Sequence, residues 1–285
     1  MASFRKKRRH RFRTFLAVMI VLGLIVFLAL WQRLTVSRYT VTLDDLPDEF
    51  NGFRIVQVTD LHCARFGDHQ EELCQKIESL EPDILVLTGD MMDQNILDPE
   101  PTRELCEYFA DKVPMYAVTG NHDQWIGTVD LTKLRQVYED CGVTLLRHET
   151  VEIERNGQII CLSGEDDPAH WGNDTVGYLQ ENPLTVEPAE DSVNILLYHR
   201  ANAFPALREL GFDLIISGHM HGGQVRIPFA GGLVSPTREY FPDYTGGKYS
   251  ENGTVMIVGR GLGNAISIPR IFNPPEVVLI TLKQK

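Results

Sequence analysis

Residues that commonly bind metal ions follow several apolar runs of this 285-residue chain. Asp60 ends the run FRIVQVTD, His62 follows two positions later, and Asp90 follows the run ILVLTG. His219 and His221 repeat the two-residue spacing within Gly-His-Met-His-Gly. Because residues two apart in a strand point to the same side, each such pair can address one ion. The pattern therefore predicts a metal site built at strand ends.

Two further clusters extend this set. The run MYAVTG leads into Asn121, His122 and Asp123, and the run NILLYH ends in His199. A single His at a strand end is usually a surface or core residue, but ligands in α/β proteins gather beyond the carboxyl edge of the sheet. Mixed His, Asp and Asn donors without thiolate suit Mn²⁺, Fe or Zn²⁺. A carboxylate shared by two ions would explain why the set exceeds the needs of one tetrahedral site.

The elements that must position these residues follow an α/β pattern. From residue 51 onward, short apolar runs alternate with stretches of helical spacing, beginning with a strand over 53–60, a helix over 69–82 and a strand over 84–90. Asn156-Gly157 predicts a tight hairpin turn. The acidic, proline-containing segment 164–192 interrupts the alternation, and we expect a rim or lid there, with solvation as the alternative explanation of its acids.

The N-terminal residues predict a membrane anchor. Residues 5–13 read RKKRRHRFR, and residues 14–31 contain no charged side chain, so they are long and apolar enough for one transmembrane helix. The basic flank predicts a single-pass protein of the cell membrane, with a cytoplasmic N-terminus and an extracytoplasmic catalytic domain. A cleaved signal peptide is the alternative, but bulky Trp31 stands where a small residue is expected. We expect a basic tail, an anchor, a linker and a catalytic domain over 1–13, 14–31, 32–50 and 51–285.

Charge and cysteine usage exclude some classes of protein. Seven Lys/Arg precede the apolar run, so the rest of the chain has 20 basic against 39 acidic side chains, a formal charge of −19. Such an exterior repels nucleic-acid phosphates, and we expect no nucleic-acid partner. The five cysteines have no Cys-x-x-Cys spacing, which argues against both a disulfide framework and a thiolate zinc site. We expect buried thiols.

The ordered motifs resemble those of the calcineurin-like metallophosphoesterase superfamily. The tail segments 221–228, 259–265 and 274–282 further resemble its membrane-tethered YkuE/YaeI-like phosphodiesterase branch. The resemblance implies a four-layer αββα sandwich of two mixed β-sheets flanked by helices. The motifs stand here as Asp60-Leu61-His62, Gly89-Asp90-Met91-Met92-Asp93, Gly120-Asn121-His122-Asp123, His199 and Gly218-His219-Met220-His221.

The resemblance also implies a role for each position. His122 would assist the leaving group without binding metal, Asp123 would orient it, and Asp93 would support the site or simply be solvated at its strand end. Asp90 would bridge two divalent metal ions. One ion would be bound by Asp60, His62 and His221, and the other by Asn121, His199 and His219.

These roles imply a metal-dependent phosphoesterase whose substrate is a phosphate ester. Because the anchor keeps the site near the outer membrane face, we expect a phosphodiesterase that hydrolyses a lipid-linked or cell-envelope phosphodiester. A cell-wall or nucleotide phosphatase is the alternative within the class. A non-catalytic metal-binding scaffold is the alternative from another class, and it is disfavoured because every ligand position is filled.

Overall fold

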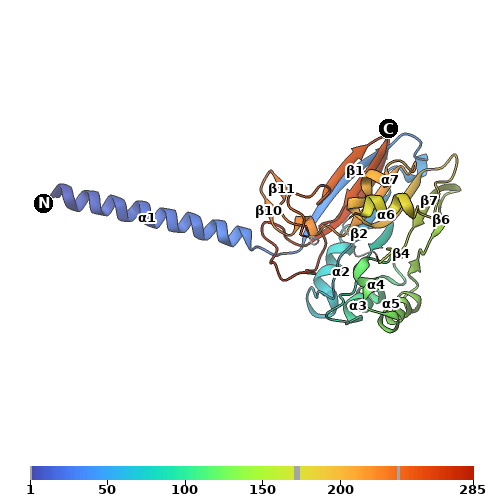
Figure 1. Cartoon of the computed structure of the whole chain (residues 1–285), viewed down its shortest axis with the longest axis horizontal. Helices are drawn as coiled ribbons and strands as arrows, with labels where there is room; N and C mark the ends of the chain where they lie inside the picture. The colour runs from blue at the N-terminus through green and yellow to red at the C-terminus, as the bar shows by residue number, and fades with distance from the viewer. Residues whose placement is uncertain (1, 170–173, 236–237) are drawn as a thin grey trace.

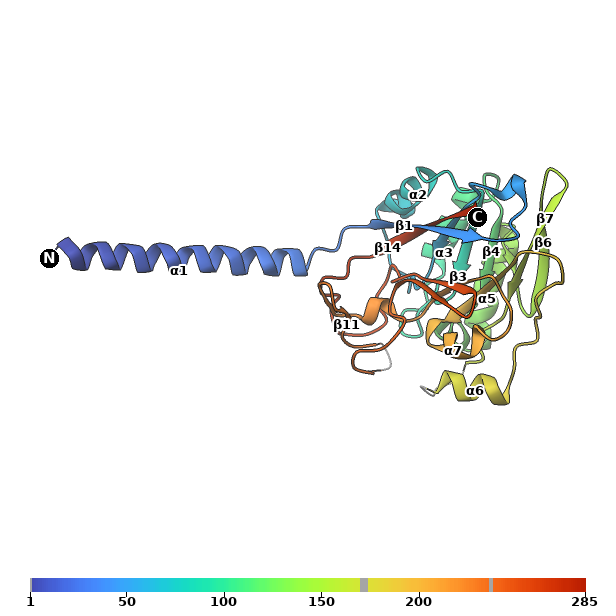
Figure 2. The same cartoon turned by 90° about the horizontal axis from the view of Figure 1, so that it is seen from above.

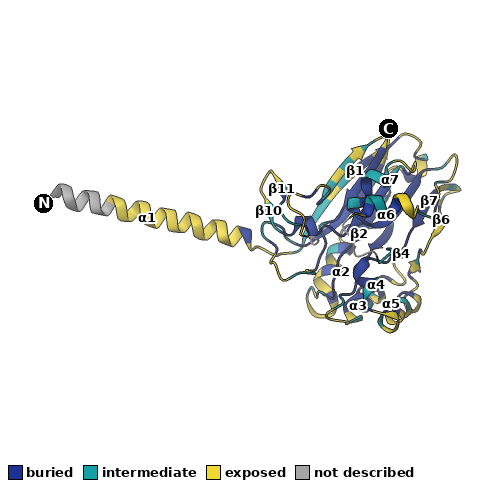
Figure 3. Ribbon diagram, in the orientation of Figure 1, coloured by how far each residue is buried: buried dark blue, intermediate teal, exposed yellow. Residues whose placement is uncertain are grey.

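A long N-terminal helix projects from a sandwich domain in the computed structural model, which describes residues 2–169, 174–235 and 238–285, with side chains from residue 10 onward (Figure 1). Helix α1 covers Ala2–Ala29, and its part from His10 to Ala29 has a mean hydropathy of 2.5. Almost none of that part is buried against the domain (Figure 3). It is the one helix in the described ranges that is long and apolar enough to cross a membrane. Helix α1 thus runs without a break from the expected tail through the expected anchor as far as Ala29.

The first sheet contains six strands, in the order β1-β14-β2-β3-β4-β5. Neighbours among β2, β3, β4 and β5 are parallel, whereas β14 is antiparallel to β2 and parallel to β1. The strand bounds are β1 Thr35–Leu43, β2 Arg54–Val58, β3 Ile84–Thr88, β4 Met115–Val118, β5 Thr144–Leu145 and β14 Glu276–Gln284.

Strand β1 corrects one prediction. The segment 32–50 was expected to be a linker, but its residues 35–43 pair along their whole length with β14. Val41 and Leu43 are buried, and Tyr39 packs against the same cluster, which is the alternation of a half-buried strand. The chain therefore enters the domain's sheet within a few residues of α1, so the anchor and the domain are joined by a short connection (Figure 2).

The second sheet also contains six strands, in the order β12-β13-β9-β8-β7-β6. Its four central strands run parallel, and its two edge strands are antiparallel to their neighbours. The predicted hairpin at Asn156-Gly157 is confirmed between β6 and β7, with both turn residues at positive φ. The strand bounds are β6 Glu149–Arg155, β7 Gln158–Gly164, β8 Asn194–Arg200, β9 Leu214–Gly218, β12 Gly247–Glu251 and β13 Thr254–Val258.

Burial alternates along the strands and divides the domain into layers. On β3, Val86 faces the second sheet within one apolar cluster, whereas Leu85 faces the helices within another. Helices α2, α3 and α5 cover the first sheet, while α6 and α7 cover the second. The predicted four-layer αββα sandwich is therefore confirmed. The helix bounds are α2 Glu71–Glu78, α3 Glu100–Phe109, α4 Asn121–Trp125, α5 Thr128–Asp140, α6 Thr175–Glu181 and α7 Phe204–Leu207.

Short elements complete the chain. The ribbon β10–β11 (Arg226–Ile227 and Gly231–Gly232) lies beside the end of α1 (Figure 1). Within the segment expected as a rim or lid, the Asp174 side chain caps α6 by accepting a hydrogen bond from the Gly177 backbone N–H, and residues 170–173, including Trp171, lie outside the described residues. Single 3-10 turns occur at η1 Asp48–Phe50, η2 Asp68–Gln70, η3 Ala201–Ala203 and η4 His221–Gly223.

Candidate metal centre

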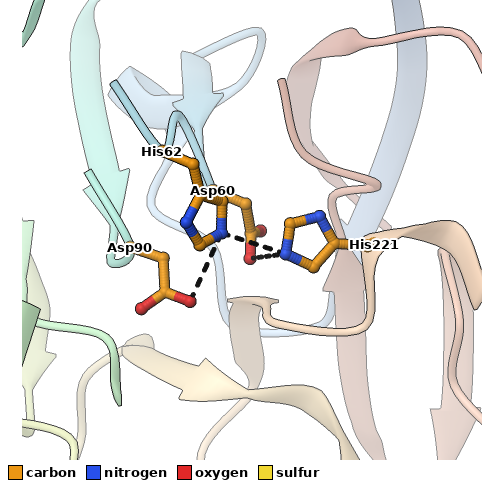
Figure 4. Close-up of side chains that lie close together, drawn as sticks. All are labelled: Asp60, His62, Asp90 and His221. Atoms are coloured by element: carbon orange, nitrogen blue, oxygen red, sulfur yellow. Dashed lines mark hydrogen bonds and ion pairs between the residues drawn. The ribbon is translucent and has the colours of Figure 1, made fainter. Parts of the chain in front are cut away.

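The predicted ligands converge at the carboxyl ends of strands from both sheets. Figure 4 shows one group, in which Asp60, His62, Asp90 and His221 point toward one another. The His62 Nε2 atom lies 3.1 Å from His221 Nε2 and 3.6 Å from Asp90 Oδ2. His221 Nε2 lies 3.3 Å from Asp60 Oδ1. The four donor atoms are within reach of a single ion.

A second group shares one residue with the first. Asp90, His199 and His219 also bring their donor atoms within reach of one ion, and His199 Nε2 lies 3.2 Å from Asp90 Oδ2. All these side chains are buried. The Asp90 carboxylate thus stands between the two groups, which is the position that a bridging ligand requires.

The backbone at the site is held in a conformation that is uncommon outside glycine. Asp60, His62, Asp90, His219 and His221 all have φ between 46° and 72°. Such residues cluster at functional sites, where the surrounding structure must fix them. Here the His219 backbone N–H donates to the Asp60 carboxylate, and the His62 N–H donates to the Asp90 carbonyl. The ligands therefore hold one another's backbones in place.

Two glycines allow the strand ends to approach this closely. A Cβ atom on Gly120 would lie 2.2 Å from Asp90 Oδ1, and one on Gly89 would lie 2.7 Å from His199 Nδ1. A side chain at either position would displace a candidate ligand. The glycines in front of Asp90 and Asn121 are therefore part of the site's geometry.

The charges inside the site depend on one another. Burial opposes ionisation of Asp90, but the adjacent His199 ring holds the pKa of that carboxyl well below its usual range. Burial also works against a charged His199, yet Asp90 raises the pKa of this ring to about 10. By contrast, burial lowers the pKa of His219 and His221, and neighbouring histidines lower it further. Two neutral imidazoles beside a carboxylate form a donor set suited to a cation.

Unpartnered donor atoms support this fit. Asn121 Oδ1 and His219 Nε2 are buried, and neither has a hydrogen-bond partner among the described residues. Leaving such atoms unsatisfied costs roughly 1–3 kcal/mol each, and coordination of a metal ion would satisfy both. All five cysteines are free and buried, as predicted, so the donor set is nitrogen and oxygen. The residues present therefore fit divalent metal ions.

The residues expected to act on the leaving group are arranged differently from the prediction. Asp123 was expected to orient His122, but its carboxylate accepts hydrogen bonds from the backbone N–H groups of Asp90, Met92 and Gly120. The carboxylate in ion-pair range of the His122 ring is that of Asp93, at 3.5 Å from Nδ1. Asp93 also lies 3.3 Å from His62 Nδ1. Asp93 thus lies beside both rings, whereas Asp123 holds the backbone around Asp90.

Two buried arginines were not found by sequence reasoning. Arg270 is 5% exposed, donates to the Gly263 carbonyl and lies 3.3 Å from His221 Nδ1. Arg200 follows His199 and forms a paired interaction with the Asp167 carboxylate, at 2.5 and 2.9 Å. The only signal for Arg270 was its place just after the glycine-rich segment 259–265, and nothing near Arg200 in the sequence indicated its partner.

The first acids of the expected rim are also buried rather than solvated. Glu165 pairs with His148, and Asp166 accepts from Thr119 Oγ1 at 2.6 Å and from Arg147 Nε at 2.9 Å. With α6 they border a hollow of about 340 Å³. These acids brace the loop that leads into Asn121, and the role of the segment as a rim or lid stays a prediction.

The fold, the strand-end ligands and their convergence define a metal-dependent hydrolase class, and comparison with known proteins gives the family. Residues 53–223 match the family described as calcineurin-like phosphoesterase. The chain belongs to this family and is a hydrolase of phosphate esters.

Three relatives illustrate the range of the family. Metallophosphoesterase YkoQ of Bacillus subtilis is 27% identical over 93% of this chain and 97% of its own length. Phosphodiesterase YaeI of Escherichia coli is 25% identical, over 81% of this chain and 82% of its own. A bovine (Bos taurus) transmembrane protein with metallophosphoesterase domain is 29% identical over 79% of this chain and 53% of its own. Together with α1, the transmembrane relatives suggest a membrane protein.

Proposed function

We propose that this protein is a phosphodiesterase that holds two divalent metal ions and acts on a lipid-linked or cell-envelope phosphodiester at the outer membrane face. The observation that carries the two-ion centre is the position of Asp90, whose carboxylate belongs to both groups of candidate ligands. In this proposal Asp60, His62 and His221 complete one ion's ligands, while Asn121, His199 and His219 complete the other's. The ions are Mn²⁺, Fe or Zn²⁺, since the donors are nitrogen and oxygen.

The chemistry requires positive charge and a proton at defined places. When bound, a pair of divalent ions activates a water molecule and neutralises charge on the phosphoryl oxygens. His122 stands at the edge of the site, with its side chain 11% exposed, so its ring can reach the leaving oxygen of a bound ester. Asp93, within ion-pair range of Nδ1, favours a proton on the ring. Protonation of the leaving oxygen by His122 contributes about 10² to 10⁴-fold to the rate.

The membrane location supports a substrate at the bilayer. Seven Lys/Arg precede the apolar part of α1, which favours a cytoplasmic N-terminus and an extracytoplasmic domain. The short connection into β1 keeps the site near the membrane surface. The relative YaeI is named a phosphodiesterase, in line with the preference for diesters.

A substrate screen on the purified full-length chain tests this function. We expect hydrolysis of bis-p-nitrophenyl phosphate after loading with Mn²⁺, and faster release from phospholipid or envelope phosphodiesters than from nucleotide monoesters. Exclusive action on monoesters would favour the cell-wall or nucleotide phosphatase. Bound metal without hydrolysis of any ester would favour the non-catalytic scaffold.

A further inference from the structure

Two loops of the domain lie against the last turn of α1, and a third loop is hydrogen-bonded to one of them. We call them the anchor-side loops and define them as residues 226–233, 238–244 and 264–274. The Phe272 backbone N–H donates to the Ala29 carbonyl at 2.7 Å, and the Gln32 side chain donates to the Arg270 carbonyl at 3.0 Å. Leu28 of α1 also lines a hollow of about 470 Å³ together with Phe229 and other residues of these loops. The loops are therefore level with the end of the apolar helix (Figure 2).

The anchor-side loops carry an unusual set of exposed side chains. Phe229 is fully exposed (110%), Tyr240 is 74% exposed and Phe241 is 66% exposed. Beyond α1 and Trp31, which closely follows it and is 40% exposed, these three are the only exposed large aromatic side chains in the part of the chain that the structure describes. The other exposed large apolar residues of the domain away from the loops are aliphatic, such as Val129 on α5. Among the described residues of the domain, exposed large aromatic side chains thus lie only in the anchor-side loops.

The aromatic residues belong to one connected surface. Ile227 and Phe229 lie on or next to the β10–β11 ribbon. The Phe241 backbone N–H donates to the Leu233 carbonyl just after the ribbon, and Tyr240 forms a bridge with Val234. Hydrogen bonds therefore hold the second loop against the first.

The backbone at these positions does not favour phenylalanine. Phe229 has φ 70° and Phe241 has φ 51°, in the left-handed region that glycine and asparagine adopt at lower cost. Neither ring offsets this cost by burial within the domain, since both are exposed. A surface outside the domain would provide that burial.

We propose that the anchor-side loops dock into the boundary between the headgroups and acyl chains of the membrane that α1 enters. The occupant is a lipid bilayer because one of these loops hydrogen-bonds to Ala29, the last residue of the apolar span itself, and another shares a hollow with Leu28. Leu28 is one residue from the end of that span, so at about 1.5 Å per residue it lies close to the membrane boundary. Side chains level with Leu28 are thus at the depth where aromatic residues collect in membrane proteins.

This docking would also orient the candidate metal centre. Only two residues separate η4, which begins at His221, from strand β10 of the ribbon. Arg270 connects the end of the anchor with the candidate metal centre, since its carbonyl accepts a hydrogen bond from Gln32 and its side chain lies beside His221. A domain fixed by α1 and by the loops would keep this edge of the sandwich at a constant height above the lipid. The docking itself does not depend on the proposed reaction.

Fluorescence quenching by lipid tests the proposal on the full-length chain in phosphatidylcholine vesicles whose acyl chains carry bromine. The variants are Phe229→Trp and Phe241→Trp, both at exposed positions where a larger ring has room. Val129→Trp is the matched control, because Val129 is 71% exposed on α5, on the side of the domain away from α1 (Figures 1 and 2). The unaltered chain gives the background, which includes Trp31 at the end of the anchor.

We expect the emission added by Phe229→Trp and Phe241→Trp to shift to shorter wavelength and to be lost in brominated vesicles, while the emission added by Val129→Trp is unchanged. Equal quenching of all three variants would overturn the proposal. The proposal would also be overturned if bromine did not quench the emission of the loop variants and a rising protein concentration protected that emission from aqueous iodide. That second outcome would identify another copy of the chain as the occupant.

Discussion

Two clusters of buried carboxylates in the domain differ in how their charges are compensated. In one, the carboxylates of Asp166 and Asp167 are paired with Arg147 and Arg200. In the other, the Asp90 carboxylate is surrounded by histidines, and buried donor atoms nearby have no hydrogen-bond partner among the described residues. The carboxylates of the first cluster are compensated within the protein, whereas the donor atoms of the second fit cations. The comparison separates a structural cluster from a candidate catalytic one.

The largest effect is expected from Asp90→Asn. The substitution keeps the shape of the side chain but removes the charge shared by both ligand groups, so metal occupancy and turnover should be lost together. Metal ions contribute several kcal/mol to the transition state, and about 4 kcal/mol corresponds to roughly 10³ in rate. Elemental analysis and hydrolysis of bis-p-nitrophenyl phosphate measure the two effects. Asp167→Asn, in the paired cluster, should keep its metal, and equal metal loss in both variants would contradict the distinction.

His122→Ala should reduce turnover by about 10² to 10⁴-fold while leaving the metal content unchanged. In the proposed function the ring lies outside the ligand sets and protonates the leaving oxygen. The loss should therefore be greater for esters with poor leaving groups than for p-nitrophenyl esters, which need little protonation. A metal-free His122→Ala protein would show that this ring is a ligand instead.

Asp167→Ala should act on stability rather than on metal binding. It leaves the Arg200 guanidinium buried without its carboxylate, which costs about 3–5 kcal/mol of unfolding free energy. Adding Arg200→Met should recover much of that loss, because the uncompensated charge is then gone. Denaturant unfolding with and without a chelator measures both variants. If the chelator abolished the difference between Asp167→Ala and the unaltered chain, the paired cluster would not be independent of the metals.

The two clusters also differ in how far the sequence predicted them. Candidate ligands such as Asp60 and His219 were predictable because each directly follows an apolar strand, and parallel strands end at one edge. The Arg200–Asp167 pair was not, because it joins residues 33 apart through packing that leaves no local pattern. Strand β1 was missed for a related reason, since its partner β14 lies about 240 residues away in the chain. Sequence spacing thus predicted which residues converge, but not which carboxylate faces which ring.

The smallest expected effect on turnover concerns which carboxylate orients the His122 ring. Asp93→Asn should lower turnover by about 10- to 100-fold, the range typical when an orienting partner is lost. Burial lowers the pKa of His122, and the nearby Asp90 and Asp93 carboxylates oppose that shift. Removing Asp93 should therefore lower the pKa of the ring, so that activity requiring protonated His122 declines at a lower pH than before.

Asp123→Asn provides the contrast. Burial and the nearby Asp90 charge raise the pKa of Asp123 to about 7, and its carboxylate holds three backbone N–H groups around the ligand loop. Replacing one acceptor oxygen with an amide group should cost roughly 1–3 kcal/mol of unfolding free energy. The pH at which activity declines on the alkaline side should hardly change. The pH–rate profiles of the two variants show which carboxylate orients the His122 ring. If the pH at which activity declines shifted in Asp123→Asn and not in Asp93→Asn, Asp123 would be the orienting residue.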